Sequence, residues 1–166
     1  MAALVKRLLG LDANILFDLA HNKGFANSFR EALQAKGYSL KVPPTVIEEL
    51  TYYALDKSCA ETPYALKASQ QLRNWGISPA ILNPADRGIS EAFSNKMILK
   101  GFLPDGEFHD GLIFLAEASL AGIPVLATSD HHLLDIEPAY LKIQFEDSDL
   151  IPVSVFHPKT LFNALK

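Results

Sequence analysis

Cysteine is nearly absent from the 166-residue sequence: Cys59 is the only one, so the chain cannot form an internal disulfide. A lone cysteine is typical of proteins in a reducing compartment, and we expect this protein in the cytoplasm. Long apolar runs are missing too. The longest, LIFLAEASLAGIPVLA, contains Glu117, Gly122 and Pro124, so it predicts a helix and then a strand rather than a membrane span. The first ten residues hold too short an apolar stretch for a signal peptide.

A strong excess of charge is also absent. The formal net charge is −4 at pH 7, and 20% of the residues are charged. This balance argues against nonspecific binding of polyanions by the whole surface, although it leaves room for a local basic patch. Hydrophobic residues make up 49% of the chain, which is enough to bury a substantial core. We therefore expect residues 1–166 to form one folded domain.

Short β-like runs alternate with longer segments whose apolar residues recur every three or four positions. The predicted strands are 8–12, 39–43, 77–82, 123–129 and 151–156. The predicted helices are 27–38, 45–57, 61–76, 89–101 and 105–122. This alternation indicates βαβ crossovers. We predict an α/β fold with three layers, α/β/α, in which helices cover both faces of a central five-stranded, mainly parallel sheet.

Three local predictions concern the segments between the strands. Thr45 has a typical N-cap side chain and would cap the helix that follows it. Residues 83–105 contain the most helix breakers and are where we expect a flexible loop or an insertion. The acidic residues between 135 and 149 predict a solvated loop.

Acidic residues recur where the predicted strands end. Asp12 ends the first strand, Glu48 and Glu49 lie on the helix after the second, Asp110 lies near the start of the helix that leads into the fourth, and Asp130 follows the fourth. Ligands of parallel α/β sheets bind outside the carboxyl ends of the strands, so we expect these carboxylates to meet at one edge. Crowded carboxylates must take up protons or be neutralised by a cation. Oxygen ligands around open positions suit Mg²⁺ or Mn²⁺.

Three segments resemble the PIN-domain nucleases, in the order in which that family has them. LDANILFDL is similar to the family's first strand and helix, PPTVIEELTYYA to its second acidic element, and DGEFHDGLIFLAEASLAGIPVLATSDHHLL to its third and fourth. The resemblance implies that an acidic quartet binds metal and performs catalysis: Asp12, Glu49, Asp110 and Asp130. The resemblance adds Asn14, Thr128 and Ser129 as supporting polar groups. Glu107, three residues before Asp110 on the same helix face, would be a further supporting group or a solvated side chain.

The resemblance also implies a function. PIN-domain nucleases, including the VapC-type toxin ribonucleases, use a divalent metal to hydrolyse phosphodiester bonds in single-stranded or exposed RNA. It further implies an antitoxin protein as partner and a homodimer, which the apolar helix TVIEELTYYALD would favour. The longer middle region departs from the compact toxin-type members. The candidates for steering RNA phosphates are basic side chains in helices or loops around the acidic elements: Lys57, Arg73, Lys96 and Lys100.

Other interpretations stay open at this point. Considered alone, each aspartate stands where it would cap a helix or lie in the first turn of one, and such a role needs no further function. Glu48 and Glu49 point about 100° apart on a helix, so one of them faces solvent, and we favour Glu49 as the ligand. The chain would alternatively be a non-catalytic PIN module that binds RNA or protein, or a Mg²⁺-dependent aspartate phosphotransfer domain. Asn14 stands where the last of these would have a second aspartate.

Overall fold

The computed structural model describes residues 7–101 and 109–166 and, for residues 109 and 110, the backbone alone. Its strands are β1 (Arg7–Leu11), β2 (Tyr38–Val42), β3 (Ile77–Pro79), β4 (Val125–Ala127) and β5 (Ser154–Phe156). Its helices are α1 (Ala13–Ala20), α2 (Gly24–Ala35), α3 (Pro44–Leu55), α4 (Thr62–Gln71), α5 (Pro84–Leu99), α6 (His109–Leu120), α7 (His131–Leu134), α8 (Pro138–Asp147) and α9 (Pro158–Ala164). Each predicted strand is present, mostly with shorter bounds.

The five strands form one sheet in the order β3-β2-β1-β4-β5, and every neighbouring pair is parallel. The chain builds the sheet outward from β1 in one direction and then returns to add β4 on the other side of β1. Strand order therefore reverses between β1 and β4. Gly10 pairs with Leu126 and Leu11 with Ala127, so the carboxyl ends of these two strands lie side by side. This is the place where ligands of parallel α/β sheets bind.

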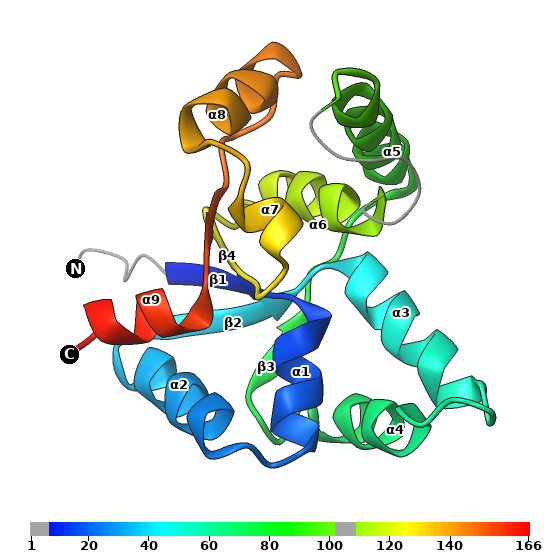
Figure 1. Cartoon of the computed structure of the whole chain (residues 1–166), viewed down its shortest axis with the longest axis vertical. Helices are drawn as coiled ribbons and strands as arrows, with labels where there is room; N and C mark the ends of the chain where they lie inside the picture. The colour runs from blue at the N-terminus through cyan, green and yellow to red at the C-terminus, as the bar shows by residue number, and fades with distance from the viewer. Residues whose placement is uncertain (1–6, 102–108) are drawn as a thin grey trace.

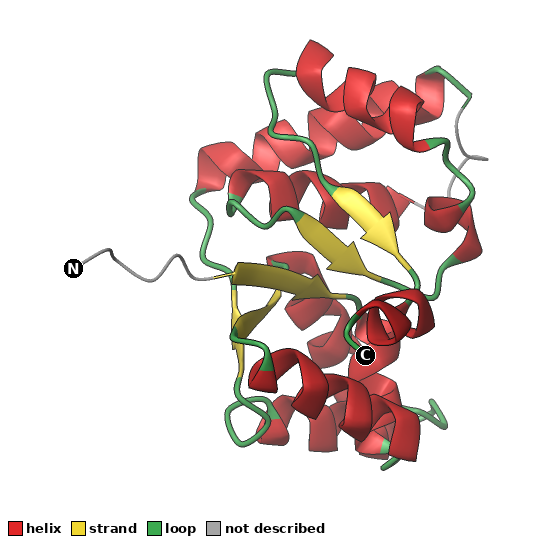
Figure 2. Cartoon of the chain, turned by 90° about the vertical axis from the view of Figure 1, so that its left-hand side faces the viewer, coloured by secondary structure: helices red, strands yellow, loops and turns green. Residues whose placement is uncertain are grey.

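Helices cover both faces of the sheet, as the sequence predicts (Figures 1 and 2). Helices α5, α6 and α8 lie in the upper half of Figure 1 and α1, α2 and α4 in its lower half, while α9 lies level with β1 and β2. Residues 111–119 of α6 are all buried because this helix lies between the sheet and α5. Within the part of the chain that the structure describes, neither α6 nor any other helix is long and apolar enough to cross a membrane.

The expectation of a flexible loop at residues 83–105 is wrong for most of that segment, because α5 occupies it, whereas the alternative of an insertion stays a prediction. The breakers stand at its start, where they begin a helix instead of interrupting one. Asn83 and Asp86 form a capping box, and Pro84 occupies the first turn, where proline is tolerated. Residues 102–105 lie outside the described part of the chain.

The acidic stretch 135–149 is not a solvated loop either, since α8 takes up most of it. Its acidic side chains are exposed, while Leu141 and Phe145 are buried. The ring of Phe145 stacks on Phe93 of α5, with centroids 4.9 Å apart. Two buried residues one helical turn apart thus attach α8 to the core, a signal that the density of charge conceals in the sequence.

Candidate active site

Asp12 follows β1 directly and is held from three sides. Its Oδ1 accepts a hydrogen bond from the Ala13 N–H at 2.6 Å, which makes it the N-cap of α1. Its Oδ2 accepts one from the Thr128 hydroxyl at 2.6 Å, and its own N–H donates to the Ala127 carbonyl at 3.1 Å. Only 5% of Asp12 is exposed. The carboxylate is therefore fixed between the carboxyl ends of β1 and β4.

Burial raises the pKa of Asp12, and the nearby charge of Asp130 raises it further. The hydrogen bonds from Thr128 and Ala13 act in the opposite direction and lower it. Each carboxylate oxygen has two lone pairs, and each uses one of them in these bonds, so the group can still bind a cation. Capping a helix and binding a metal are thus compatible roles for Asp12.

Thr128 connects Asp12 to Asp130. Its hydroxyl oxygen accepts the Asp130 N–H at 3.0 Å while its proton is donated to Asp12. Asp130 is half-buried, and its Oδ1 accepts the His132 N–H at 2.9 Å as the N-cap of α7. The fully buried hydroxyl thereby holds two of the predicted site residues beside each other.

A groove of about 570 Å³ adjoins this pair of aspartates. It is lined by Asn14, Phe17, Asp18, His21, Lys23, Glu49, Tyr53, Glu61 and Ser129. Three of these are predicted site residues, one each from α1, α3 and the segment after β4: Asn14, Glu49 and Ser129. Ser129 adjoins Thr128 and Asp130 in the chain, and Asn14 lies two residues after Asp12, so the groove and the aspartates belong to one edge of the sheet.

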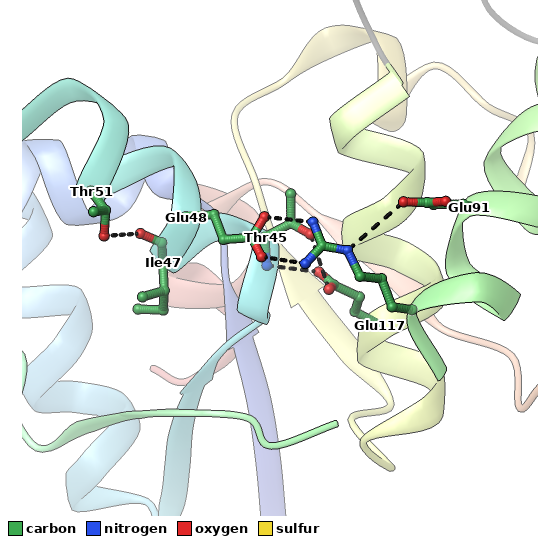
Figure 3. Close-up of polar contacts among 7 residues, drawn as sticks. Thr45, Ile47, Glu48, Thr51, Glu91 and Glu117 are labelled. Atoms are coloured by element: carbon green, nitrogen blue, oxygen red, sulfur yellow. Dashed lines mark hydrogen bonds and ion pairs between the residues drawn. The ribbon is translucent and has the colours of Figure 1, made fainter. Parts of the chain in front are cut away.

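Glu48 and Glu49 face different surroundings. Glu48 accepts two hydrogen bonds from the Arg87 guanidinium, at 2.8 and 3.1 Å (Figure 3). Glu48 and Arg87 line a separate pocket of about 380 Å³ between α3, α5 and α6. Glu49 is half-buried and lines the groove beside Asp12. This geometry favours Glu49 over Glu48 as a ligand, a choice that stays a prediction.

The cap of α3 comes from another helix, so the prediction that Thr45 caps it is wrong. Pro43 stands at the N-cap and offers no side-chain hydrogen bond. Instead, Glu117 of α6 accepts the Thr45 N–H at 3.1 Å and the Thr45 hydroxyl at 3.0 Å (Figure 3). Glu117 is buried, and burial raises its pKa. This carboxylate therefore fastens α6 to the start of the helix that carries Glu49.

Two predicted site residues cannot be placed in full. Asp110 lies in the first turn of α6, as expected, but its side chain is outside the described residues, and so is the whole of Glu107. In the described part of the chain, no group of three or more histidine, cysteine, aspartate or glutamate side chains is arranged to hold a metal ion. Mg²⁺ is commonly bound by one or two carboxylates, waters and substrate phosphates, so Asp12 and Asp130 fit such an ion. The full quartet stays a prediction.

The sequence pattern does not single out the remaining groove residues: Phe17, Asp18, His21, Lys23, Tyr53 and Glu61. A usable signal was nevertheless present. Residues 17, 18 and 21 follow Asn14 by three, four and seven positions, and Tyr53 follows Glu49 by four. These intervals place side chains on one face of a helix, so each predicted site residue could have been extended along its helix.

The predicted steering residues divide into two groups. Lys96 donates to the Ser148 hydroxyl at 3.1 Å, and Lys100 donates to the Gln144 side chain at 2.6 Å. These two lysines connect α5 with α8 and the turn after it. Lys57 and Arg73 are exposed, and their contact with substrate stays a prediction.

The sequence matches no protein-family model and no curated protein. The fold, in contrast, is similar to solved structures. One is the crystal structure of VapBC2 from Rickettsia felis bound to a DNA fragment from their promoter, with a TM-score of 0.60, 14% identity, and coverage of 90% of this chain and 98% of that chain. Another is VapBC-1 from nontypeable Haemophilus influenzae, with a TM-score of 0.57, 16% identity, and coverage of 92% and 98%. At such identities the likeness shows the fold, and the predicted PIN-like α/β/α architecture is confirmed.

Proposed function

We propose that this chain is a divalent-metal-dependent ribonuclease that hydrolyses phosphodiester bonds in single-stranded or exposed RNA. The observation that carries the proposal is the buried Asp12 carboxylate, fixed by Thr128 at the point where strand order reverses and repelled by Asp130. Two adjacent carboxylates of this kind are stabilised by a divalent cation. The PIN-like fold, shared with chains of VapBC structures, supports the same function.

A bound Mg²⁺ or Mn²⁺ would polarise the scissile phosphate and lower the pKa of the attacking water. The chain's own residues supply the fixed geometry. The Thr128 hydroxyl and the Ala13 N–H each hold one oxygen of Asp12, so the carboxylate keeps its orientation without a bound ion. Asp130 contributes a second carboxylate at the same edge, and Glu49, in the groove wall, is the third proposed ligand. Asp110 is the fourth proposed ligand, from the first turn of α6.

The biological role that we propose is the toxin of a toxin–antitoxin pair, acting in the cytoplasm with an antitoxin protein as partner. Its support is the VapBC identity of the similar structures. We further propose that the chain forms a homodimer, because α3 leaves large apolar side chains exposed.

The strand order weighs against one alternative. Receiver domains, which use an aspartate and Mg²⁺ for phosphotransfer, have the order 2-1-3-4-5. This sheet has the order 3-2-1-4-5. The phosphatase-like form of this alternative is not tested by strand order, and Asn14 weighs against it because it stands where a second aspartate would be. A further alternative is a non-catalytic PIN module that binds RNA or protein, and cleavage assays separate it from the nuclease.

The test is cleavage of a broad panel of single-stranded RNAs by the purified protein with Mn²⁺ or Mg²⁺. We expect the wild-type protein to cleave some of these RNAs, and cleavage to stop when the metal is chelated. Asp12→Asn and Asp110→Asn each keep the shape of the side chain but remove one negative ligand, so each should abolish cleavage while the protein stays folded. If the wild type cleaves no RNA, or if both variants cleave as well as it does, the proposal is wrong.

Glu49→Gln and Glu48→Gln form a matched pair of neighbours on one helix. Glu49→Gln should abolish cleavage because it removes a ligand from the groove. Glu48→Gln should leave most of the activity, because Glu48 is engaged with Arg87 on a different surface. The opposite result would assign the ligand role to Glu48.

A further inference from the structure

The groove beside Asp12 is lined by aromatic rings from two helices. Phe17 and His21 come from α1 and the residue after it, and Tyr53 comes from α3. The rings of Phe17 and Tyr53 meet edge to face, with centroids 5.9 Å apart at an interplanar angle of 81°. The metal mechanism proposed above uses none of these three rings. Aromatic side chains that line a groove are the usual platforms for unpaired nucleobases.

The imidazole of His21 is held as a flat platform. One of its faces stacks on Tyr64, with centroids 3.6 Å apart and an interplanar angle of 24°. Its Nε2 lies 3.4 Å from Glu61 Oε2. These two contacts fix the plane of the ring. His21 also lines the groove with 31% of its side chain exposed, so another planar group can stack on it there. A base stacked there would extend the stack that Tyr64 and His21 already form.

The charges of the groove favour a base over a phosphate. Three carboxylates line it, Asp18, Glu49 and Glu61. Among the described residues that line the groove, Lys23 is the only lysine or arginine, and it is paired with Asp18 at 2.7 Å. A phosphate in the groove would therefore meet mostly negative charge, whereas a base is uncharged. Asp18 and Glu61 are already paired with Lys23 and His21, but a carboxylate has several acceptor sites and no donor. These two side chains therefore favour a base that carries an amino group.

The position of the platform suits a nucleotide close to the scissile bond. Asp12 and His21 cap the two ends of α1. At about 1.5 Å per residue, this eight-residue helix is about 12 Å long. A short single-stranded segment that starts at the aspartates would thus lie along α1 and bring one of its bases to His21.

We propose that His21 and Tyr53 form a nucleobase-binding subsite, which stacks a base of the RNA near the scissile phosphate and prefers adenine, cytosine or guanine to uracil. This inference rests on the proposed ribonuclease function, because it takes the substrate to be RNA. It adds the part of the substrate that the groove recognises and the residues that recognise it.

The first test is fluorescence anisotropy with labelled hexaadenylate, hexacytidylate and hexauridylate, measured without added metal on Asp12→Asn protein so that the RNA stays intact. We expect hexaadenylate and hexacytidylate to bind more tightly than hexauridylate. Adding His21→Ala should weaken hexaadenylate binding about tenfold, the usual effect of removing one stacking platform. Adding His21→Phe, which keeps a flat ring, should restore most of the affinity.

Tyr53 and Tyr52 provide a matched pair of neighbouring tyrosines. Tyr53 lines the groove, whereas Tyr52 is 66% exposed and is not among its lining residues. Tyr53→Ala should weaken binding and Tyr52→Ala should not, with melting temperatures recorded for every variant. The subsite is refuted if no hexanucleotide binds, if the three bind equally, or if folded His21→Ala and Tyr53→Ala proteins both bind as tightly as their parent.

The same variants, made in the active protein, separate this inference from the nuclease proposal. If the wild type cleaves RNA and His21→Ala changes neither binding nor base preference, the nuclease stands and the subsite fails. If the three hexanucleotides and the variants behave as expected but no RNA is cleaved, the subsite stands and the nuclease fails.

Discussion

The Thr128 hydroxyl lies 2.6 Å from Oδ2 of Asp12 and joins two residues that are 116 positions apart in the sequence. Both are buried, and the same hydroxyl oxygen accepts the backbone N–H of Asp130. One side chain thus sets the geometry of the carboxylates on which the proposed chemistry depends. It also offsets part of the unfavourable free energy of burying Asp12, because it lowers a pKa that burial raises.

Thr128→Val keeps the shape of the side chain but removes the hydroxyl. We expect it to lower the free energy of unfolding by about 1–3 kcal/mol, since the Asp12 carboxylate loses a donor and the Asp130 N–H loses its acceptor. Urea denaturation measures this change. Thr128→Ser, which keeps the hydroxyl, should lose less stability. Equal losses in the two variants would show that the methyl group matters and the hydrogen bond does not.

Without metal, the contribution of Asp12 to stability should fall as pH rises, whereas the contribution of a salt-bridged aspartate rises with pH. The pKa of Asp12 in the folded protein lies above its usual value of 3.8, so its contribution to stability is complete below that pH and is lost as pH rises through the folded-state pKa. Asp12→Asn removes this loss. The melting temperature of the variant minus that of the wild type should therefore grow with pH in chelator, and added Mn²⁺ should reduce it. A difference that stays constant with pH would contradict the account.

Glu117→Ala should destabilise the protein although it lies away from the groove. The change leaves the Thr45 N–H and hydroxyl without their acceptor at the start of α3, which we expect to reduce the free energy of unfolding by about 1–3 kcal/mol. Hydrogen exchange at the Thr45 amide should become faster. Glu117→Gln keeps one acceptor oxygen and should lose less. Unchanged exchange in Glu117→Ala would show that this cap does not hold α3.

The homodimer can be tested on α3. Tyr52 is 66% exposed and Leu55 is 76% exposed, and the two lie three positions apart on the same helix, where they could pack against a second copy of the chain. We expect light scattering at tens of micromolar to give the mass of a dimer, and Leu55→Glu to shift it toward monomer. A wild-type protein that is monomeric at these concentrations would contradict the dimer.

The layers and the parallel sheet could be predicted because their signals are local. Strands such as β4 are apolar on both faces, and each is separated from the next by a segment with helical periodicity. The errors came where local signals are ambiguous. Pro84 both breaks and begins helices, and the charged residues of α8 hide the two buried positions, Leu141 and Phe145, that attach it to the core.

Only the part of the site that lies at the ends of strands could be predicted from the sequence. The sequence predicts that Asp12 and Asp130 come to one edge, and the structure brings them together. The sequence does not predict that Thr128 links them or that Glu117 caps α3, because these contacts join residues that are 116 and 72 positions apart. Such pairings depend on the tertiary fold. The aromatic residues of the groove, Phe17, His21 and Tyr53, follow helical spacing from Asn14 and Glu49, so they could have been predicted from the sequence.

The most direct test of the central claim is calorimetric titration of the protein with Mn²⁺, which asks whether the Asp12 carboxylate holds a divalent ion. The account predicts a binding heat for the wild type, a rise in melting temperature with Mn²⁺, and the loss of both in Asp12→Asn. Glu48→Gln should bind Mn²⁺ like the wild type. No heat and no shift in melting temperature at millimolar Mn²⁺ would contradict the account, and so would an Asp12→Asn protein that binds the ion as tightly as the wild type.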